Sequence, residues 1–404
     1  MGKIPFEETV IELEPIRKVK AIITDVSKKL GIDPIDLAQG NPIGVIPQQF
    51  AEIFSDLLLA QSRESLSSCG YCPSSGLPEY LERMARYERE TFGLNVTADH
   101  ILAVPGAAAG LGVIFSALAI EQKGNVVIPS PFFPAYREFI ENVGLEARVT
   151  KYRCSEEEVL REIRDEITPD TLAVLINSPN NPSGRIFSSE FLKGLSWLLV
   201  QESSKRIGKQ DIVLISDQPY RRLIQSQVEV PVVANVVEYP YVIEGDSFSK
   251  EARLAGYRIG YVTVGPKFPN PRRIRDLLAS RLIPLSIIQS STPIQWALAR
   301  CDLPFNLDWS ENFSAMNSFA SQLEDIGYGV IRPDGGLFMC VKVKGVKSDV
   351  LHENLIKLAV GNADGQYFGM SPEDGFVRLS FFDAKVANHP DAINRFRTVY
   401  SSLN

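Results

Sequence analysis

Hydrophobic and polar positions follow two different periods along most of this chain. Short uninterrupted apolar runs, typical of buried strands, occupy residues 101–104, 125–128, 172–177, 212–216, 241–244 and 261–264. Between them, at residues 107–120, 135–142, 156–166 and 188–204, the pattern is that of helices. Apolar strands that alternate with helices are typical of a mostly parallel sheet covered on both faces. The pattern therefore predicts an α/β fold with a mostly parallel central sheet sandwiched by helices.

The two ends of the chain predict a second, smaller α+β unit. Apolar residues recur with helical spacing over residues 15–30, and Gly31 ends that predicted helix. Residues from Asp276 to about Gly327 read as largely helical, with a proline-interrupted stretch at 283–293. Strands are predicted at 337–343 and 376–381, and helices at 349–360 and from about residue 390. We expect an arm and helix at 1–40 that belong to the small domain, a large domain at 41–295 and a small C-terminal domain at 296–404.

Composition and charge narrow the class of protein. The 404 residues are 45% hydrophobic and 23% charged, with a formal net charge of −7 and no basic run. These values suit a soluble globular protein and argue against nucleic acid or an acidic membrane surface as a partner. No apolar run has membrane-spanning length, and Glu7, Glu8, Glu12 and Glu14 do not suit a secretory signal. Five cysteines make no disulfide framework, so we expect a cytoplasmic protein.

One C-x-x-C run, Cys69 to Cys72, raises the possibility of redox or zinc chemistry. Such a site needs a second ligand pair or a thioredoxin-like context, and the three histidines are scattered along the chain. We therefore interpret the run as a plain loop and predict no metal site.

A lysine near a predicted strand end is the most informative candidate. Lys250 comes shortly after the run at 241–244, together with Ser247 and Ser249, and Arg258 follows eight residues later. Burial lowers the pKa of an ammonium group, and the neutral amine can form a Schiff base. Hydroxyls and a guanidinium suit a phosphate group. A lysine that reacts with an aldehyde beside a phosphate site indicates pyridoxal 5′-phosphate (PLP).

Other polar or small residues follow other predicted strands. The small residues 105–110 after the first strand predict either an anion site at a helix N-terminus or tight helix–sheet packing. Gly40 lies at a turn, where it allows either close approach of a ligand or an ordinary chain reversal. Further candidates near strand ends or in the small domain are Phe133, Asn181, Asp217, Tyr220 and Arg378. In open α/β sheets the ligand lies beyond the carboxyl ends of the strands, so we expect one shared site.

Three motifs carry a resemblance to a known family. They are P-N-N-P-S-G at 179–184, D-x-x-Y at 217–220 and S-x-S-K-x₇-R at 247–258. Their order and spacing resemble those of the class I/II aminotransferases, which are fold-type I PLP-dependent enzymes, from Gly40 to Arg378. The resemblance implies a homodimeric transferase with PLP as cofactor. It would move an amino group between an amino acid and a 2-oxo acid through a Lys250 aldimine.

The same resemblance implies a role for each candidate residue. Lys250 would hold PLP and then act as general base, and Asp217 would pair with the pyridine nitrogen. Tyr220 and Asn181 would bond the ring's 3′ oxygen, and Phe133 would stack on the ring. The phosphate would be held by Gly106, Ala107, Ala108, Ser247, Ser249, Arg258 and the other subunit's Tyr71. Arg378 would clamp the substrate carboxylate, beside Asn181 and the Gly40 backbone.

Some positions depart from the family pattern, and they bear on the substrate. Gln218 follows Asp217 where the family usually has an acidic residue. Ala107 to Ala109 are small where some dicarboxylate-specific members carry a lysine, and the other arginine that such members use has no counterpart near residues 286–291. We therefore expect that the substrate is not aspartate bound in the usual way.

Two alternative functions also fit the sequence. A PLP-dependent lyase or cyclase would use the same Cα carbanion, and the acidic N-terminal arm could favour a cationic substrate. A transcription regulator with an aminotransferase-like domain is disfavoured, because the family pattern begins by residue 40 and the net charge is negative.

Overall fold

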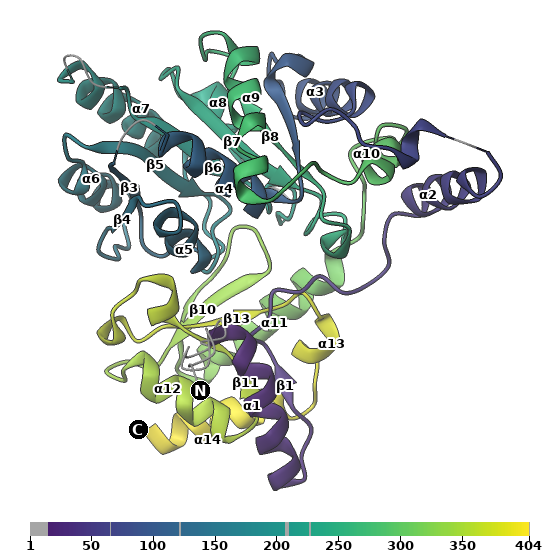
Figure 1. Cartoon of the computed structure of the whole chain (residues 1–404). Coiled ribbons are helices and arrows are strands. Elements are labelled where there is room, and N and C mark those ends of the chain that lie inside the picture. Colours follow the sequence, from purple (N-terminus) through teal and green to yellow (C-terminus); the bar gives the residue numbers. More distant parts are fainter. Residues whose placement is uncertain (1–14, 65, 121–122, 207–209, 226–227, 404) are drawn as a thin grey trace, which may run out of the picture.

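The structure is a computed structural model that describes residues 15–64, 66–120, 123–206, 210–225 and 228–403. Figure 1 shows two bodies, one above the other, with the N-terminal helix α1 (Pro15–Leu30) in the lower body. The acidic residues predicted to form an arm lie outside the described residues. None of the described helices is long and apolar enough to cross a membrane.

The upper body is built on a seven-stranded sheet. Its strands, in spatial order, are β2 (Ile101–Val104), β8 (Gly260–Val264), β7 (Val242–Ser247), β6 (Val213–Asp217), β5 (Thr171–Asn177), β3 (Asn125–Ile128) and β4 (Glu146–Val149). The five strands from β7 to β4 pair in parallel, and β8 pairs antiparallel with both of its neighbours. The predicted mostly parallel sheet is therefore confirmed.

Helices cover both faces of this sheet because successive side chains of each strand point to opposite sides. In β6, Leu214 joins one hydrophobic core and the next residue, Ile215, joins the other. The core with Ile215 lies against α4 (Ala107–Leu118), α5 (Ala135–Glu141) and α9 (Pro271–Ser280). The opposite face is covered by α6 (Glu156–Glu166), α7 (Ser189–Ser204), α8 (Val233–Val236), α3 (Pro78–Phe92) and α10 (Thr292–Leu298).

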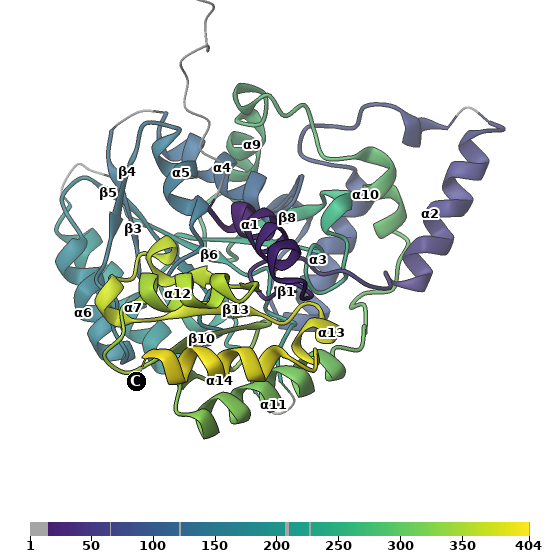
Figure 2. The ribbon, with the colours of Figure 1, turned by 90° about the horizontal axis from the view of Figure 1, so that it is seen from below.

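The lower body has its own core around a four-stranded sheet. That sheet has the order β12 (Ala363–Asp364), β13 (Val377–Ser380), β10 (Phe338–Lys342) and β9 (Gly329–Ile331). Its helices are α1, α11 (Ser310–Ile326), α12 (Ser348–Lys357), α13 (Ala384–Ala387) and α14 (Ala392–Leu403), which Figure 2 shows from below. A short parallel pair of β1 (Ile35–Asp36) with β11 (Val360–Gly361) ties the N-terminal segment to this body. The domain boundaries at residues 40 and 295 stay a prediction.

Several elements differ from the sequence-based expectation. Helix α2 (Gln48–Gln61), which projects from the upper body in Figures 1 and 2, and the edge strand β4 were not predicted. Each residue of β4 is at least partly exposed, so the strand lacks the apolar run that marks its neighbours. The expectation of mostly helix from Asp276 to Gly327 is wrong for residues 299–309, which form no helix. Strand β7 extends further than predicted and ends at Ser247.

Candidate active site

A cavity of about 250 Å³ lies beyond the carboxyl ends of β5, β6 and β7, where the upper body meets the lower one. It brings together most of the predicted site residues: Gly40, Ala107, Ala108, Phe133, Asn181, Asp217, Tyr220, Ser247, Ser249, Lys250, Arg258 and Arg378. Gly106 lies directly behind this wall, against Arg258. Tyr71 does not line the cavity, and 87% of it is exposed to solvent. Gly40 and Arg378, which are 338 positions apart in sequence, thus share one site.

Lys250 lies in the turn after β7 and extends its amine into the cavity. Its Nζ donates a hydrogen bond of 2.6 Å to the carbonyl oxygen of Gly40. Burial, with Arg378 and Arg258 adding like charge, lowers the pKa of this amine from 10.5 to about 8. About a tenth of the amine is therefore neutral at pH 7 and can act as a nucleophile or a base.

Asp217 is the last residue of β6, and its carboxyl group is buried. The Tyr136 hydroxyl donates a hydrogen bond of 2.5 Å to Oδ2, and Asn177 Nδ2 donates one of 2.9 Å to the Asp217 carbonyl oxygen. Burial raises the pKa of the carboxyl from 3.8 to about 7, although the Tyr136 bond opposes this rise. Oδ1 is buried and has no hydrogen-bond partner among the residues that the structure describes. It can therefore accept a proton-bearing group of a ligand in the cavity.

Tyr136 and Asn177 also line the cavity, and sequence reasoning assigned them no role. Tyr136 lies in α5, and an aromatic residue in a helix is usually interpreted as part of the hydrophobic core. The sequence does not show which residue its hydroxyl bonds. Burial raises the pKa of this hydroxyl well above 10, so Tyr136 stays a proton donor to Asp217. Asn177 ends β5 and was read only as the end of a strand.

The N-terminus of α4 forms an anion cradle. Gly106 precedes the helix with φ of +85°, and no side chain caps the first turn. The first backbone N–H groups of a helix have no intrahelical acceptor and carry partial positive charge. Arg258 lies against this turn, where it donates hydrogen bonds of 3.0 Å and 3.1 Å to the carbonyl oxygens of Ala255 and Pro105. Together with the buried Ser247, these groups suit a phosphate.

Arg378 reaches the cavity from β13 of the lower body and is buried. It donates a hydrogen bond of 2.9 Å to Asn181 Oδ1 and another to the carbonyl oxygen of Ala38. Its guanidinium lies 4.6 Å from the ring centre of Phe338 and 4.9 Å from that of Phe368. A planar cation held between aromatic rings suits a carboxylate ligand.

Tyr220 lies in the turn after β6 and is buried against the edge of the Phe338 ring. Burial raises the pKa of its hydroxyl, and the nearby Asp217 adds to the rise. The hydroxyl is therefore protonated and can donate a hydrogen bond into the cavity.

These groups fit PLP. The uncapped helix end with Arg258 suits its phosphate, Lys250 suits its aldehyde, and the unpartnered Asp217 Oδ1 suits a protonated ring nitrogen. Residues 32–393 match the family model described as aminotransferase class I and II. The chain belongs to this family. It is an enzyme, a PLP-dependent aminotransferase with the fold-type I architecture.

Several named relatives cover nearly the whole chain. The aspartate/prephenate aminotransferase of Thermus thermophilus is 26% identical over 387 residues, which is 92% of each chain. The asparagine–oxo-acid transaminase of Streptococcus mutans is 27% identical over 396 residues, again 92% of each chain. A solved aminotransferase from Eubacterium rectale superposes with a TM-score of 0.88 at 26% identity, and the match covers 97% of this chain and 96% of the other. These relatives are aminotransferases, so the lyase or cyclase alternative is not favoured.

Proposed function

We propose that Lys250 holds the cofactor covalently at its aldehyde and later moves the Cα proton of the substrate. The cofactor supplies an electron sink that stabilises negative charge at Cα. The pKa of about 8 supports both tasks of Lys250, because the same amine must be neutral to attack and able to accept a proton. Its bond to the Gly40 carbonyl aims the amine into the cavity and not towards bulk solvent.

The remaining cofactor contacts follow from the same geometry. Asp217 Oδ1 would accept a hydrogen bond from the protonated ring nitrogen, since this oxygen is buried and has no hydrogen-bond partner among the described residues. Tyr220 and Asn181 would bond the 3′ oxygen, and Phe133 would stack on the ring face. The phosphate would be held by Gly106, Ala107, Ala108, Ser247, Ser249 and Arg258.

The substrate, in our proposal, is an α-amino acid with an uncharged side chain. Its α-carboxylate would bind Arg378, beside Asn181 and the Gly40 backbone. The described residues that line the cavity include three cations, and the roles above already use Lys250, Arg258 and Arg378. No cation among these residues is left to pair with a second substrate carboxylate.

The apolar part of the lining supports the same substrate class. It includes Ile16, Leu111, Phe133, Phe139 and Phe338, together with small residues of the α4 turn. A charged side chain would lose its hydration against such a wall without gaining a partner. The observation that carries this proposal is therefore the absence of a fourth lining cation in the described part of the chain.

A substrate panel tests the proposal. The purified enzyme would be given aspartate, asparagine, leucine and phenylalanine, each with pyruvate, 2-oxoglutarate and phenylpyruvate as acceptors. We expect kcat/KM for leucine or phenylalanine to exceed that for aspartate by at least about tenfold, the discrimination expected of one unpaired buried charge. Aspartate as much the best donor, in line with the names of several relatives, would contradict the proposal.

We also propose that the active unit is a homodimer in the cytoplasm. Tyr71 is exposed to solvent in the isolated chain, and an aromatic residue of this size suits burial by a second copy. In that dimer Tyr71 would contribute to the phosphate site of the other subunit. The free cysteines support a reducing compartment. The net charge of −7 supports small-molecule partners and not nucleic acid. Light scattering of the parent and of Tyr71→Ala tests the dimer, and the PLP dissociation constant of Tyr71→Ala tests the contribution of this residue to the phosphate site.

A further inference from the structure

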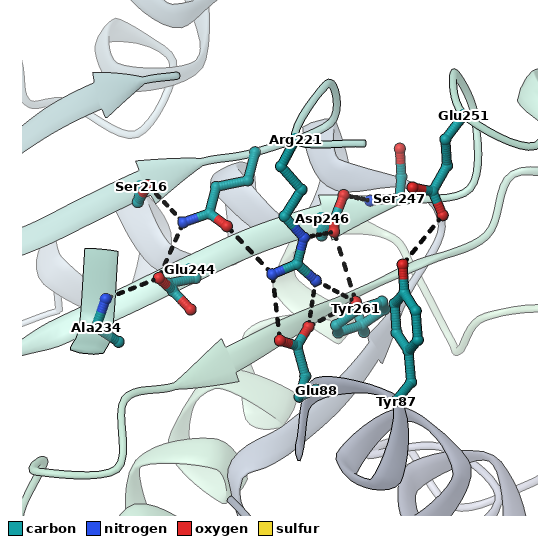
Figure 3. Close-up of polar contacts among 11 residues, drawn as sticks. Tyr87, Glu88, Ser216, Arg221, Ala234, Glu244, Asp246, Ser247, Glu251 and Tyr261 are labelled. Carbon is teal, nitrogen blue, oxygen red and sulfur yellow. Dashed lines mark hydrogen bonds and ion pairs between the residues drawn. The ribbon is translucent and has the colours of Figure 1, made fainter. Parts of the chain in front are cut away.

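A cluster of buried charged side chains lies directly behind the active site. It contains the carboxylates Glu88, Glu244, Asp246 and Glu251, the guanidinium of Arg221, and the polar residues Ser216, Gln218, Tyr87 and Tyr261. Figure 3 shows this buried charge cluster between strands of the sheet and the helix that carries Glu88. Burying a charge costs free energy unless the charge is paired. The presence of this cluster inside the protein therefore requires an explanation.

Arg221 is the centre of this buried charge cluster. Its two terminal nitrogens bond both oxygens of Glu88, with Nη1 at 3.2 Å from Oε2. Nη1 also lies 3.3 Å from Gln218 Oε1, and Nη2 lies 2.8 Å from the Tyr261 hydroxyl. Nε forms an ion pair of 2.7 Å with Asp246 Oδ2, without the geometry of a hydrogen bond. One side chain thus joins α3, β7, β8 and the turn after β6 (Figure 3).

The cluster lies on the opposite face of the strands from the cofactor side. Side chains alternate between the two faces along a strand. Ser216 of β6 is paired with Glu244 of β7, and the next pair is Asp217 with Gly245. Ser216 and Glu244 therefore point into the buried charge cluster, while Asp217 points into the cavity.

Five cluster residues are direct sequence neighbours of residues that line the cavity. Ser216 and Gln218 flank Asp217, and the other pairs are Arg221 with Tyr220, Asp246 with Ser247, and Glu251 with Lys250. One link is also a hydrogen bond, because Asp246 Oδ1 accepts from the Ser247 backbone N–H at 2.7 Å. Contacts of Arg221 with Gln218 and Asp246 therefore hold from behind the segments that carry Asp217, Tyr220 and Ser247. Glu251 instead accepts a hydrogen bond of 3.4 Å from the Tyr87 hydroxyl.

Gln218 fits this arrangement because it is neutral and has both a donor and an acceptor. Its Nε2 donates to Ser216 Oγ and to Glu244 Oε1, both at 2.9 Å, and its Oε1 faces Arg221. A carboxylate at this position would add a fifth acid to a cluster with one central arginine. The amide instead connects Glu244 to Arg221 without adding charge.

We propose that Arg221 is a positioning residue of the active site, which fixes the segments carrying Asp217, Tyr220 and Ser247 from the rear face of the sheet. This inference rests on the proposed roles of those three residues. Arg221 itself is not among the residues that line the cavity. Its loss would free several segments at once, so cofactor binding would weaken although every cofactor contact is still present.

The experiment compares Arg221→Met, Arg221→Lys and the matched control Arg275→Met. Arg275 is also buried and pairs with Asp99 and Asp276, but it lies on α9 and borders no residue of the cavity. The first measurement is the dissociation constant of PLP for each cofactor-free protein. The second is the pH midpoint of the visible absorption band of the bound cofactor, which a general loss of stability would not move.

We expect Arg221→Met to bind PLP on the order of tenfold more weakly than the parent, and its absorption midpoint to shift upward because a nearby positive charge is lost. Arg275→Met should keep the PLP dissociation constant within about twofold of the parent, the ordinary effect of a distant site. Its absorption midpoint should stay at the pH of the parent. Equal PLP affinity in Arg221→Met and the parent, or the same loss in both methionine variants, would overturn the proposal.

Arg221→Lys keeps the charge and decides the question if Arg221→Met does not fold. A lysine carries its three N–H donors on one nitrogen, whereas Arg221 reaches Glu88, Gln218 and Tyr261 from two separate nitrogens. We therefore expect the PLP affinity of Arg221→Lys to lie below that of the parent. A lysine variant that binds PLP like the parent would overturn the positioning role.

Lys250→Ala, measured alongside, separates this inference from the proposed function. If Lys250→Ala keeps full turnover, the proposed function fails. If it is inactive while Arg221→Met binds PLP like the parent, only the inference about Arg221 fails.

Discussion

The lowered pKa of Lys250 gives the most direct prediction, because it fixes how much of the amine is neutral at a given pH. With a pKa of about 8, about 9% of the amine is neutral at pH 7 and about 91% at pH 9, a tenfold rise. A lysine with the ordinary pKa of about 10.4 would show a rise of about 100-fold over the same range. The two cases therefore differ in both the slope and the midpoint of the profile.

The assay is reductive methylation of the cofactor-free protein with formaldehyde, since only the neutral amine attacks an aldehyde. Peptide mass spectrometry would give the rate at Lys250 from pH 6 to pH 10, with the exposed Lys151 as an internal reference for the reagent. We expect a profile at Lys250 that levels off above pH 9. A rate that keeps rising in parallel with the reference would refute the reasoning.

A substitution at Arg378 tests the causes of the shift. Burial is the largest cause, and the charge of Arg378 is the second. Arg378→Gln should therefore move the methylation midpoint of Lys250 to higher pH, but leave it well below 10.4. A midpoint that reaches the ordinary lysine value would mean that charge, and not burial, controls the amine.

Three further predictions concern the cofactor side of the cavity. Gly106→Ala should weaken PLP binding at least about tenfold in equilibrium dialysis, because φ is +85° and the new Cβ would lie 2.7 Å from Arg258 Nη2. Asp217→Asn should stabilise the cofactor-free protein by about 4 kcal/mol at pH 8 and much less at pH 4. Because the Asp217 pKa is raised in the folded protein, the parent loses folding stability as the pH rises from 3.8 to about 7. Equal shifts of the denaturation midpoint of Asp217→Asn at pH 4 and pH 8 would contradict this prediction. Tyr136→Phe should lower kcat about tenfold and move the acid limb of the pH–rate profile upward, since the lost bond keeps the Asp217 pKa down; an unchanged limb would argue against that role.

Much of the site could be predicted because its polar residues follow apolar strands. Asp217 and Lys250 interrupt or follow runs of buried residues, and a charge at such a place has few purely structural explanations. The sheet itself could be predicted because its inner strands are apolar on both faces. The contact of Tyr71 with the phosphate site stays a prediction, since that site would belong to another chain.

The parts that sequence reasoning missed depend on contacts between distant residues. Glu88 and Arg221 are 133 positions apart, and each reads as an ordinary exposed charge on its own segment. Tyr136 was missed because an aromatic residue on a helix normally packs in the core, and only its hydroxyl distinguishes it. Helix α2 was missed although Phe50 and Leu57 are buried on one side, because its exposed face also carries leucines.

The position of Arg378 has a mechanical consequence for the enzyme. The residue belongs to the lower body, yet it bonds Asn181 of the upper body, so the carboxylate site that we propose would be complete only while the two bodies are in contact. Lys250 and the phosphate cradle lie entirely in the upper body. A rotation of one body relative to the other would therefore release the product while the cofactor remains bound to the upper body.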